Sequence, residues 1–354
     1  MAPGSAAAWI SPVDETARGN LLGAAAVAAQ REGRELAAIV EGSDRADAAI
    51  DAAREIGLMI LPESDQVLAD SAQELTFLRR ARTEGWRLLL LSHGADSMAR
   101  SGELAEQTLT RLAATPGPSA PRPMPPAALR HRVSVGTEST FFRSGLMHVE
   151  CFDKCLAAAG ASIAASTDIL DWGAGCGRMT SHLAGRAPGA RVVASDTDAE
   201  AIAWVAENLD LHAAQALPLL PPSPLADDAF DLVVGHSVFS HLDVGAQDRW
   251  LAELARVTRS GGHIAVSFNG PLALRWHLEH PLVEVPDSVE AEVARDGIAI
   301  WRGDGWEEEF YEGYHTTFHA HDYVREHWGR WAEVVAIDEA AALPTQDIAV
   351  LRSR

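Results

Sequence analysis

The chain has 354 residues, of which 47% are hydrophobic and 22% are charged, a globular composition with enough length for two domains of ordinary size. Its formal net charge of -21 and its pI near 5.0 disfavour nucleic acid and anionic membranes as partners, because no basic patch offsets the acidity. Three cysteines, an odd number in a long chain, argue against a disulfide framework and favour reduced, structural thiols. We expect a cytoplasmic protein with neither a signal peptide nor a membrane span.

Residues 1–114 alternate short apolar runs with amphipathic runs. Strands are expected at residues 36–40, 58–61 and 86–91, and helices at residues 45–56, 69–84 and 103–112. This alternation predicts a small N-terminal α/β domain. Ser92, His93 and Asp96 follow the last of these strands, but no glycine fingerprint accompanies them, so ordinary turn residues are the simpler interpretation. The role of this domain is left unassigned.

Residues 115–127 are rich in proline and interrupt the pattern. Such a sequence cannot hold a helix or an inner strand, and it predicts an extended, semi-rigid linker. We therefore place a domain boundary here and expect a second domain over residues 128–354.

The most informative stretch of the second domain is residues 168–178, which reads Asp-Ile-Leu-Asp-Trp-Gly-Ala-Gly-Cys-Gly-Arg. An apolar strand ends at Asp171 and is followed by glycines at alternate positions, Gly173, Gly175 and Gly177. Glycine permits positive φ and lets a ligand approach the backbone, and the following helix offers unpaired N–H groups. This pattern predicts a ligand-binding turn rather than a purely structural one.

The next strand, residues 191–195, ends at Asp196, a little over 20 residues beyond the first glycine. A carboxylate at this spacing suits the two hydroxyls of a ribose. A dinucleotide fingerprint would need a third glycine at position 178, where the chain has Arg178. The pattern therefore indicates a nucleoside cofactor other than a dinucleotide.

The segment from Asp171 to Gly177 resembles motif I of the class I S-adenosylmethionine-dependent methyltransferases. Residues 221–228 and 230–234 are similar to that family's proline-bearing approach and fourth strand, and residues 235–242 resemble the segment that lines its methyl-donor pocket. Residues 260–262 resemble its turn before a fifth strand at 263–268, with Ser260 where proline is commoner. Helices are expected at 146–159 and at 249–259, the latter with Thr258 on its inward face, and two final strands at 332–337 and 347–351.

The resemblance covers about residues 130–354 and implies a Rossmann-like seven-stranded sheet, parallel with an antiparallel final hairpin. It also implies S-adenosyl-L-methionine as the cofactor, with Asp171 at its amino group, Asp196 at the ribose and Thr197 beside the adenine. Gln215 is placed near the adenine amino group only loosely, because no clean third strand is visible between Leu209 and Leu217. The implied cofactor contacts are Asp171, Gly173, Ala174, Gly175, Gly177, Asp196, Thr197, Gln215, His236 and Ser237.

Methyl transfer needs positioning, and it needs a general base if the acceptor arrives protonated. Histidine suits a base near neutral pH, and the candidates are His236, His241 and His319. Capping or packing histidines remain the alternative for each. His315, His319 and His321 could ligate a metal with Asp322, but their spacing matches no motif, so no metal is assigned.

Residues 271–318 form an insertion after the fifth strand, which commonly builds a lid over the acceptor in this fold. Its aromatic and acidic residues could enclose a cationic or heteroaromatic acceptor, and a solvated acidic face over core tryptophans is the alternative. The candidate substrate contacts are Trp276, Trp306, Tyr314 and His315.

These observations predict a methyltransferase that acts on O or N of a small-molecule acceptor, with natural product biosynthesis or a saccharide acceptor favoured by family analogy. Two alternatives remain open: a cofactor-binding scaffold without transfer activity, and a nicotinamide-dependent oxidoreductase. No nucleic acid or membrane partner is expected, and a homodimer is left open.

Overall fold

A computed structural model of the chain describes residues 6–8, 59–60, 87–89, 122–133, 138–278, 285–302, 314–342 and 345–354. The chain divides into two compact units. Met1–Ser119, Ser134–Arg143 and Trp276–Glu284 form one unit, and Ala120–Val133, Ser144–Arg275 and Val285–Arg354 form the other. Among the described helices, none has the length and apolar character needed to cross a membrane.

Three short strands of the first unit are described, β1 (Ala6–Ala8), β2 (Met59–Ile60) and β3 (Arg87–Leu89), and they run parallel in the order β2-β1-β3. β2 and β3 fall inside two of the expected strands. β1 was not expected, because alanine has low β propensity. The expected strand at 36–40, the three expected helices and most of the linker lie outside the described residues, so the N-terminal α/β domain stays a prediction.

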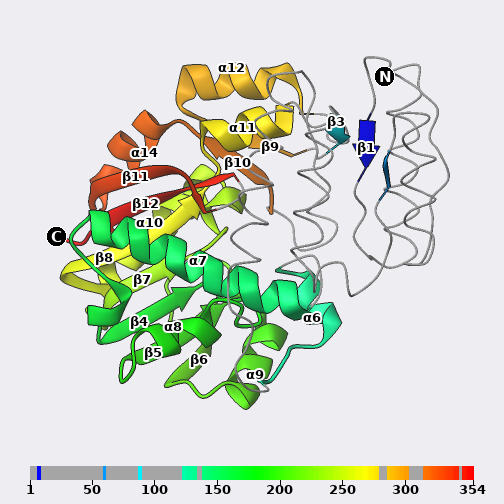
Figure 1. Cartoon of the computed structure of the whole chain (residues 1–354). Helices are drawn as coiled ribbons and strands as arrows, with labels where there is room; N and C mark the ends of the chain where they lie inside the picture. Colours follow the sequence, from blue (N-terminus) through cyan, green and yellow to red (C-terminus); the bar gives the residue numbers. More distant parts are fainter. Residues whose placement is uncertain are drawn as a thin grey trace. The chain divides into compact units, whose positions relative to one another are not determined.

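A seven-stranded sheet organises the second unit, in the order β11-β12-β8-β7-β4-β5-β6 (Figure 1). The strands β8, β7, β4, β5 and β6 are parallel, and β12 runs antiparallel to both β8 and β11. The predicted sheet with an antiparallel final hairpin is confirmed. The bounds are β4 Asp168–Trp172, β5 Arg191–Asp196, β6 Ala213–Ala216, β7 Phe230–Gly235, β8 Thr258–Phe268, β11 Glu333–Ala342 and β12 Gln346–Arg352.

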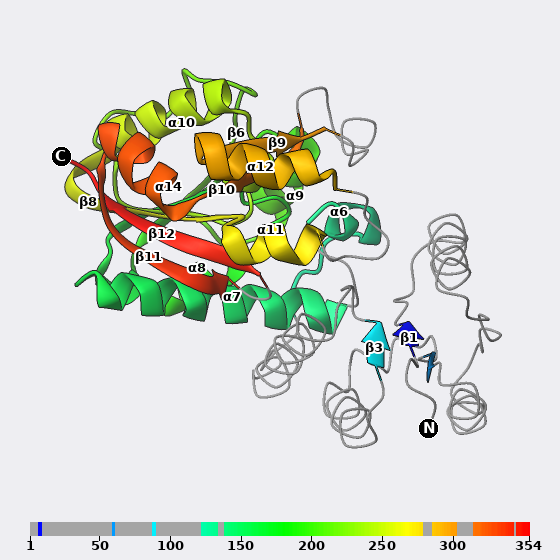
Figure 2. The same cartoon turned by 90° about the horizontal axis from the view of Figure 1, so that it is seen from above.

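Helices cover both faces of this sheet (Figure 2). On one face, Phe152 of α7 (Glu138–Ala158) and Leu183 of α8 (Thr180–Arg186) share a core cluster with Ile169 of β4. On the other face, Leu251 of α10 (Val244–Val257) shares a cluster with Leu170, the next residue of β4. Successive residues of the strand therefore face opposite clusters, as expected for a strand buried on both sides.

The remaining described elements join these layers. They are α6 (Ala127–His131), η2 (Ile163–Ala165), α9 (Ala199–Asn208), η3 (Phe239–His241), α11 (Pro271–Leu278), α12 (Asp287–Asp296), β9 (Ile298–Trp301), β10 (Thr316–His319), α14 (His321–His327) and η4 (Trp328–Arg330). β9 and β10 pair antiparallel, so the insertion after β8 contains helices and a separate two-stranded sheet.

Several predicted boundaries were wrong. α7 begins at Glu138, and α10 begins at Val244, where the side chain of Asp243 accepts a hydrogen bond from the N–H of Ala246. β8 begins at Thr258, so this residue does not lie on the inward face of a helix, and residues 260–262 lie inside the strand. A register shift in the pairing of β7 with β8, together with φ of 80° at Gly261, lets the strand bend there rather than turn.

Candidate cofactor and acceptor site

The glycine turn leaves β4 at its carboxyl edge and is held by backbone hydrogen bonds to the neighbouring strand. The N–H groups of Gly173 and Ala174 donate to the carbonyl of Ser195 at 2.8 and 3.0 Å. φ is 76° at Gly173 and 53° at Gly175. A Cβ on Gly173 would lie 2.2 Å from a methyl carbon of Val238, so glycine is required there both by the backbone angle and by the close approach.

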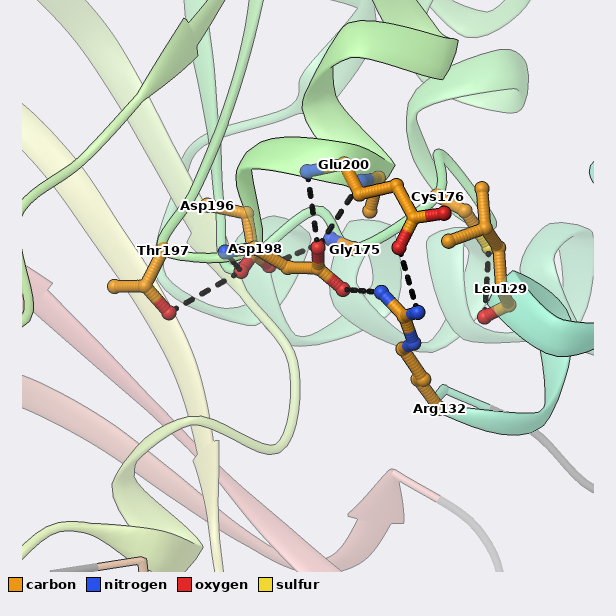
Figure 3. Close-up of polar contacts among 9 residues, drawn as sticks. Leu129, Arg132, Gly175, Cys176, Asp196, Thr197, Asp198 and Glu200 are labelled. Atoms are coloured by element: carbon orange, nitrogen blue, oxygen red, sulfur yellow. Dashed lines mark hydrogen bonds and ion pairs between the residues drawn. The ribbon is translucent and has the colours of Figure 1, made fainter. Parts of the chain in front are cut away.

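Asp196, predicted at the ribose, lies beside this turn. Its Oδ2 accepts a hydrogen bond of 2.7 Å from the N–H of Gly175, and its Oδ1 accepts one of 2.8 Å from the N–H of Asp198 (Figure 3). The hydroxyl of Thr197 lies 3.5 Å from Oδ1. Burial raises the pKa of Asp196, and these backbone hydrogen bonds oppose the rise. The structure thus brings together three of the predicted cofactor residues.

Asp171, predicted at the amino group of the cofactor, is 2% exposed. Its Oδ2 accepts a hydrogen bond of 2.6 Å from the hydroxyl of Thr180, a partner that the sequence did not indicate. Burial raises the pKa of Asp171 to about 6, and the Thr180 hydrogen bond acts in the opposite direction. A buried carboxylate with one hydrogen bond has capacity left for a ligand cation.

Arg178 joins two histidines from distant parts of the chain. Its guanidinium donates to Nδ1 of His148 at 3.0 Å and to Nδ1 of His236 at 3.1 Å, and the two rings lie 4.2 Å apart between centroids. Both rings accept a hydrogen bond from Arg178 at Nδ1, so Nδ1 is unprotonated in each ring. Removal from water lowers the pKa of Arg178 to about 10. No carboxylate forms an ion pair with Arg178 in the part of the chain that the structure describes.

Burial and the neighbouring His148 and Arg178 hold the pKa of His236 well below its usual range. The Nε2 of His236 is buried and has no hydrogen-bond partner within the described ranges. These properties argue against the predicted role of His236 as a base at neutral pH. An N–H donor without a partner, next to a cation, instead suits a bound anionic group.

Ser237 begins the segment after β7 with φ of 61°, a sparsely populated angle for a residue with a side chain. Its N–H donates to the hydroxyl of Ser267 at 2.7 Å, and its hydroxyl accepts from the side-chain amide of Gln346 at 2.9 Å. The hydroxyl of Ser240 lies 3.1 Å away. This network fixes the backbone at the carboxyl end of β7 and links it to β12.

α6 and the residues after it cover the glycine turn, a contact that the sequence did not predict. Arg132 forms ion pairs with Asp198 at 2.8 Å and with Glu200 at 2.7 Å, at the start of α9 (Figure 3). The thiol of Cys176 lies 3.5 Å from the carbonyl of Leu129. Burial raises the pKa of Cys176 to about 12, which agrees with a structural thiol rather than a nucleophile.

Two predicted acceptor contacts, Tyr314 and His315, meet the candidate base His241 beyond the end of β7. The Nδ1 of His241 donates to the carbonyl of His315 at 3.0 Å, and the N–H of His315 donates back to the carbonyl of His241 at 3.2 Å. The ring of Tyr314 stacks on His241 at 4.2 Å. This group joins η3 to the residues before β10.

His319 lies elsewhere, in the core. It is 1% exposed, its Nε2 donates to the side-chain oxygen of Gln247 at 3.1 Å, and its ring packs against Phe268 and Trp328. Burial lowers the pKa of His319 to about 3. This burial argues against the predicted role of His319 as a base, because a core position keeps the ring neutral and away from an acceptor.

The other predicted residues are less informative. Gln215 lies in β6 beside Ser195, and its amide donates to the carbonyl of Ala216. Trp276 lies in α11 with its ring against His277, and Trp306 lies outside the described residues. Where side chains are described, no group of three or more histidine, cysteine, aspartate or glutamate residues could hold a metal ion.

The sequence profile of a family described as "Methyltransferase domain" matches residues 169–262 of the chain. No curated protein matches the chain. A solved S-adenosylmethionine-dependent methyltransferase from Mesorhizobium loti is 15% identical, with 56% of this chain and 96% of that chain covered and a TM-score of 0.42. The 1,6-didemethyltoxoflavin-N1-methyltransferase of Burkholderia thailandensis is 16% identical, with 67% and 93% covered and a TM-score of 0.42. The N-methyltransferase NodS of Bradyrhizobium japonicum is 16% identical, with 58% and 85% covered and a TM-score of 0.34.

The matched residues begin in β4, include the glycine turn, Asp196 and β7, and end within β8 of the seven-stranded sheet. Residues 169–262 of the chain therefore carry a methyltransferase domain, and the activity that this domain supports is methyl transfer from S-adenosylmethionine.

The site fits S-adenosyl-L-methionine as the cofactor of this domain. The glycine turn is fixed by backbone hydrogen bonds to Ser195 and packs closely against Val238, so its backbone is ordered before a ligand binds. Asp171 offers a buried carboxylate, and Arg178 with His236 offers a cation and an unpartnered N–H. A ligand that carries an amino group, a carboxylate and a ribose matches this set of groups.

Proposed function

We propose that the chain transfers the methyl group to O or N of a small-molecule acceptor in the cytoplasm, in natural product biosynthesis or on a saccharide. The observation that carries this proposal is the group formed by His241, Tyr314 and His315. It lies beyond the carboxyl end of β7, the edge at which the glycine turn leaves β4. Stacked rings with polar edges suit a compact, hydrogen-bonding acceptor.

The cofactor supplies an electrophilic methyl group on a sulfonium, and the residues of the chain hold and orient it. Asp171 holds the amino group, Asp196 the ribose hydroxyls, and Arg178 with His236 the carboxylate. Gly173, Ala174, Gly175 and Gly177 let the ligand approach the backbone, with Thr197 and Gln215 toward the adenine and Ser237 toward the methionine portion. Most of the rate then comes from positioning the acceptor in line with the methyl group.

Calorimetry of the full chain with S-adenosylhomocysteine and with NAD tests the cofactor part. We expect binding of S-adenosylhomocysteine, and loss of this binding in Asp171→Ala. Binding to NAD alone would contradict the proposal.

An acceptor panel tests the transfer. Phenols, sugars, alcohols, heterocyclic N–H compounds and amines are incubated with radiolabelled S-adenosylmethionine, and label is counted in the small-molecule fraction. We expect at least one small acceptor to be labelled. Cofactor binding without any labelled product would favour the scaffold alternative.

A further inference from the structure

A histidine and a carboxylate that the groups above do not use form a close pair at the same edge of the sheet. The Nε2 of His321, the first residue of α14, donates to Oδ2 of Asp347 in β12 at 2.6 Å. Asp347 is opposite Phe268, the last residue of β8, and it follows Gln346, whose amide donates to the hydroxyl of Ser237. The pair therefore lies at the end of the sheet that carries the cofactor turn.

The side chain of Asp347 is completely buried, which is costly for a carboxylate unless it is well bonded. Besides His321, it accepts a hydrogen bond of 2.8 Å from the N–H of Ala340. A Cβ on Gly270 would lie 1.8 Å from Oδ2 of Asp347, so the chain makes room for this carboxylate with a glycine. Burial raises the pKa of Asp347, and the two hydrogen bonds oppose the rise.

The hydrogen bond to a carboxylate fixes the tautomer of His321. In the neutral ring Nε2 carries the proton, and Nδ1 keeps its lone pair. The side chain is 29% exposed, and Nδ1 has no hydrogen-bond partner among the residues that the structure describes. Of the other histidines, His236 and His319 are buried and have lowered pKa values. His321 thus combines a partly exposed ring with a buried carboxylate behind it.

We propose that His321 is the general base of the methyl transfer and that Asp347 positions it; this inference rests on the proposed function. Nδ1 takes the proton of an acceptor O–H or N–H, and the acceptor atom forms a bond to the methyl carbon. The carbon–sulfur bond breaks, and its electron pair stays on sulfur. Asp347 stabilises the imidazolium, which returns its proton to water through the exposed part of the ring.

A base of this kind defines the class of acceptor. A hydroxyl or a heterocyclic N–H needs to lose a proton during the transfer, whereas a tertiary amine does not. We therefore infer a protonated acceptor, such as a phenolic or alcoholic hydroxyl. His321 faces Asp347 from β12 and the ring edge of Phe268 from β8, and the charge of Glu339 from β11 raises the pKa of Asp347.

A second pair on the same helix offers a matched control. The Nε2 of His327 lies 2.6 Å from Oδ1 of Asp248, and its ring stacks on Tyr323, but Asp248 is on α10 and its side chain is 36% exposed. A purely structural role for such pairs predicts that His321→Gln and His327→Gln behave alike. A catalytic role predicts that only His321→Gln slows the transfer.

The first test needs no acceptor. Long-range nitrogen–proton NMR of the full chain should show His321 with Nε2 protonated and Nδ1 unprotonated, and Asp347→Asn should change this tautomer distribution. His321 with a protonated Nδ1, or an unaltered spectrum in Asp347→Asn, would overturn the proposal whether or not an acceptor is known.

The second test uses the phenols of the acceptor panel at pH 7. With a weakly acidic phenol, His321→Gln should lower kcat by about 100-fold or more while S-adenosylhomocysteine binds as in the wild type, and His327→Gln should keep most of the activity. The defect of His321→Gln should shrink with 4-nitrophenol, which is partly ionised at neutral pH, and with rising pH. Equal losses with all acceptors, or no loss, would overturn the proposal. A wild-type chain that labels no acceptor would instead contradict the proposed function, and the NMR result would still decide the arrangement of the pair.

Discussion

The carboxylate of Asp196 accepts a hydrogen bond of 2.7 Å from the backbone N–H of Gly175. This contact ties the end of β5 to the middle of the glycine turn, two segments that are 21 residues apart. The acid therefore orders the turn before a ligand binds, and its oxygens keep lone pairs at the place where we propose that the ribose hydroxyls bind. Preorganisation of this kind reduces the entropic cost of binding.

Replacement of Asp196 should weaken the cofactor more than it weakens the fold. In Asp196→Asn the side-chain oxygen can still accept from Gly175, but the charge and one acceptor oxygen are lost. We expect the Kd of S-adenosylhomocysteine to rise by about 10-fold to 100-fold, the range for a hydrogen bond to a charged group. Calorimetry measures it, with Asp227→Asn as the control, because Asp227 is an exposed partner of Arg256. An unaltered Kd would contradict the role of Asp196.

The charge of Asp171 should lower the stability of the fold and increase the affinity for the cofactor. Its folded-state pKa of about 6 lies above the ordinary value of 3.8, so between these pH values the folded chain holds a proton that the unfolded chain has released. The stability contributed by this proton is present below the unfolded pKa and is lost as the pH rises through 6. At pH 7 the buried charge costs on the order of 3 kcal/mol, at 1.36 kcal/mol per pKa unit.

Asp171→Asn removes this charge and keeps an acceptor for Thr180. We expect thermal unfolding of the cofactor-free protein at pH 7 to move up by several degrees, while affinity for S-adenosylhomocysteine falls. In the wild type, affinity should decrease as the pH falls through 6, because a protonated carboxyl no longer attracts the amino group. A lower melting temperature in Asp171→Asn, or a flat pH dependence of the wild-type Kd, would show that the charge of Asp171 serves the fold and not the ligand.

Local sequence predicted the parts of the site that lie within one β-strand and its following turn. The sequence predicted the glycine turn, Asp171 and Asp196, because their spacing indicates a strand followed by a turn and the start of a helix. β6 could not be predicted, because it is a four-residue edge strand of alanine and glutamine that leaves two residues exposed, and neither its composition nor its periodicity indicates a strand.

The partners of these residues could not be predicted for a different reason. His148 reaches Arg178 across 30 residues, and Gln346 reaches Ser237 across 109. Such pairs depend on strand order and on how the helices pack on the sheet, and neither can be derived from a single sequence. The predicted boundaries were wrong where a cap or a bend sets the end of an element, as at Asp243 before α10 and at Gly261 within β8.

Arg178 should recognise the carboxylate of the cofactor. Arg178→Met keeps much of the side-chain volume and removes the cation, leaving His148 and His236 without their donor. We expect the Kd of S-adenosylhomocysteine to rise by about 10-fold or more. An analogue of S-adenosylhomocysteine that lacks the carboxylate separates the causes. It should bind the wild type weakly, and Arg178→Met should weaken it little further.

A loss in Arg178→Met that is equally large for the analogue would mean that the cation holds the two histidines rather than the ligand. Circular dichroism and thermal unfolding, measured on the same samples, show whether the variant is folded.

The ion pairs of Arg132 should act on the rate of cofactor release more than on stability. Both pairs are partly exposed, so each contributes at most about 1 kcal/mol to folding. They hold Val133 against Gly175, where an added Cβ would lie 2.3 Å from a methyl carbon of Val133. In Arg132→Gln this cover over the turn is released. We expect the melting temperature to change little, while the dissociation rate of S-adenosylhomocysteine, followed by stopped flow, rises several-fold.

The control variant is Arg352→Gln, which breaks a similar exposed ion pair with Glu333 on the final hairpin and should leave the release rate unaltered. Equal release rates in the two variants would show that α6 does not retain the cofactor.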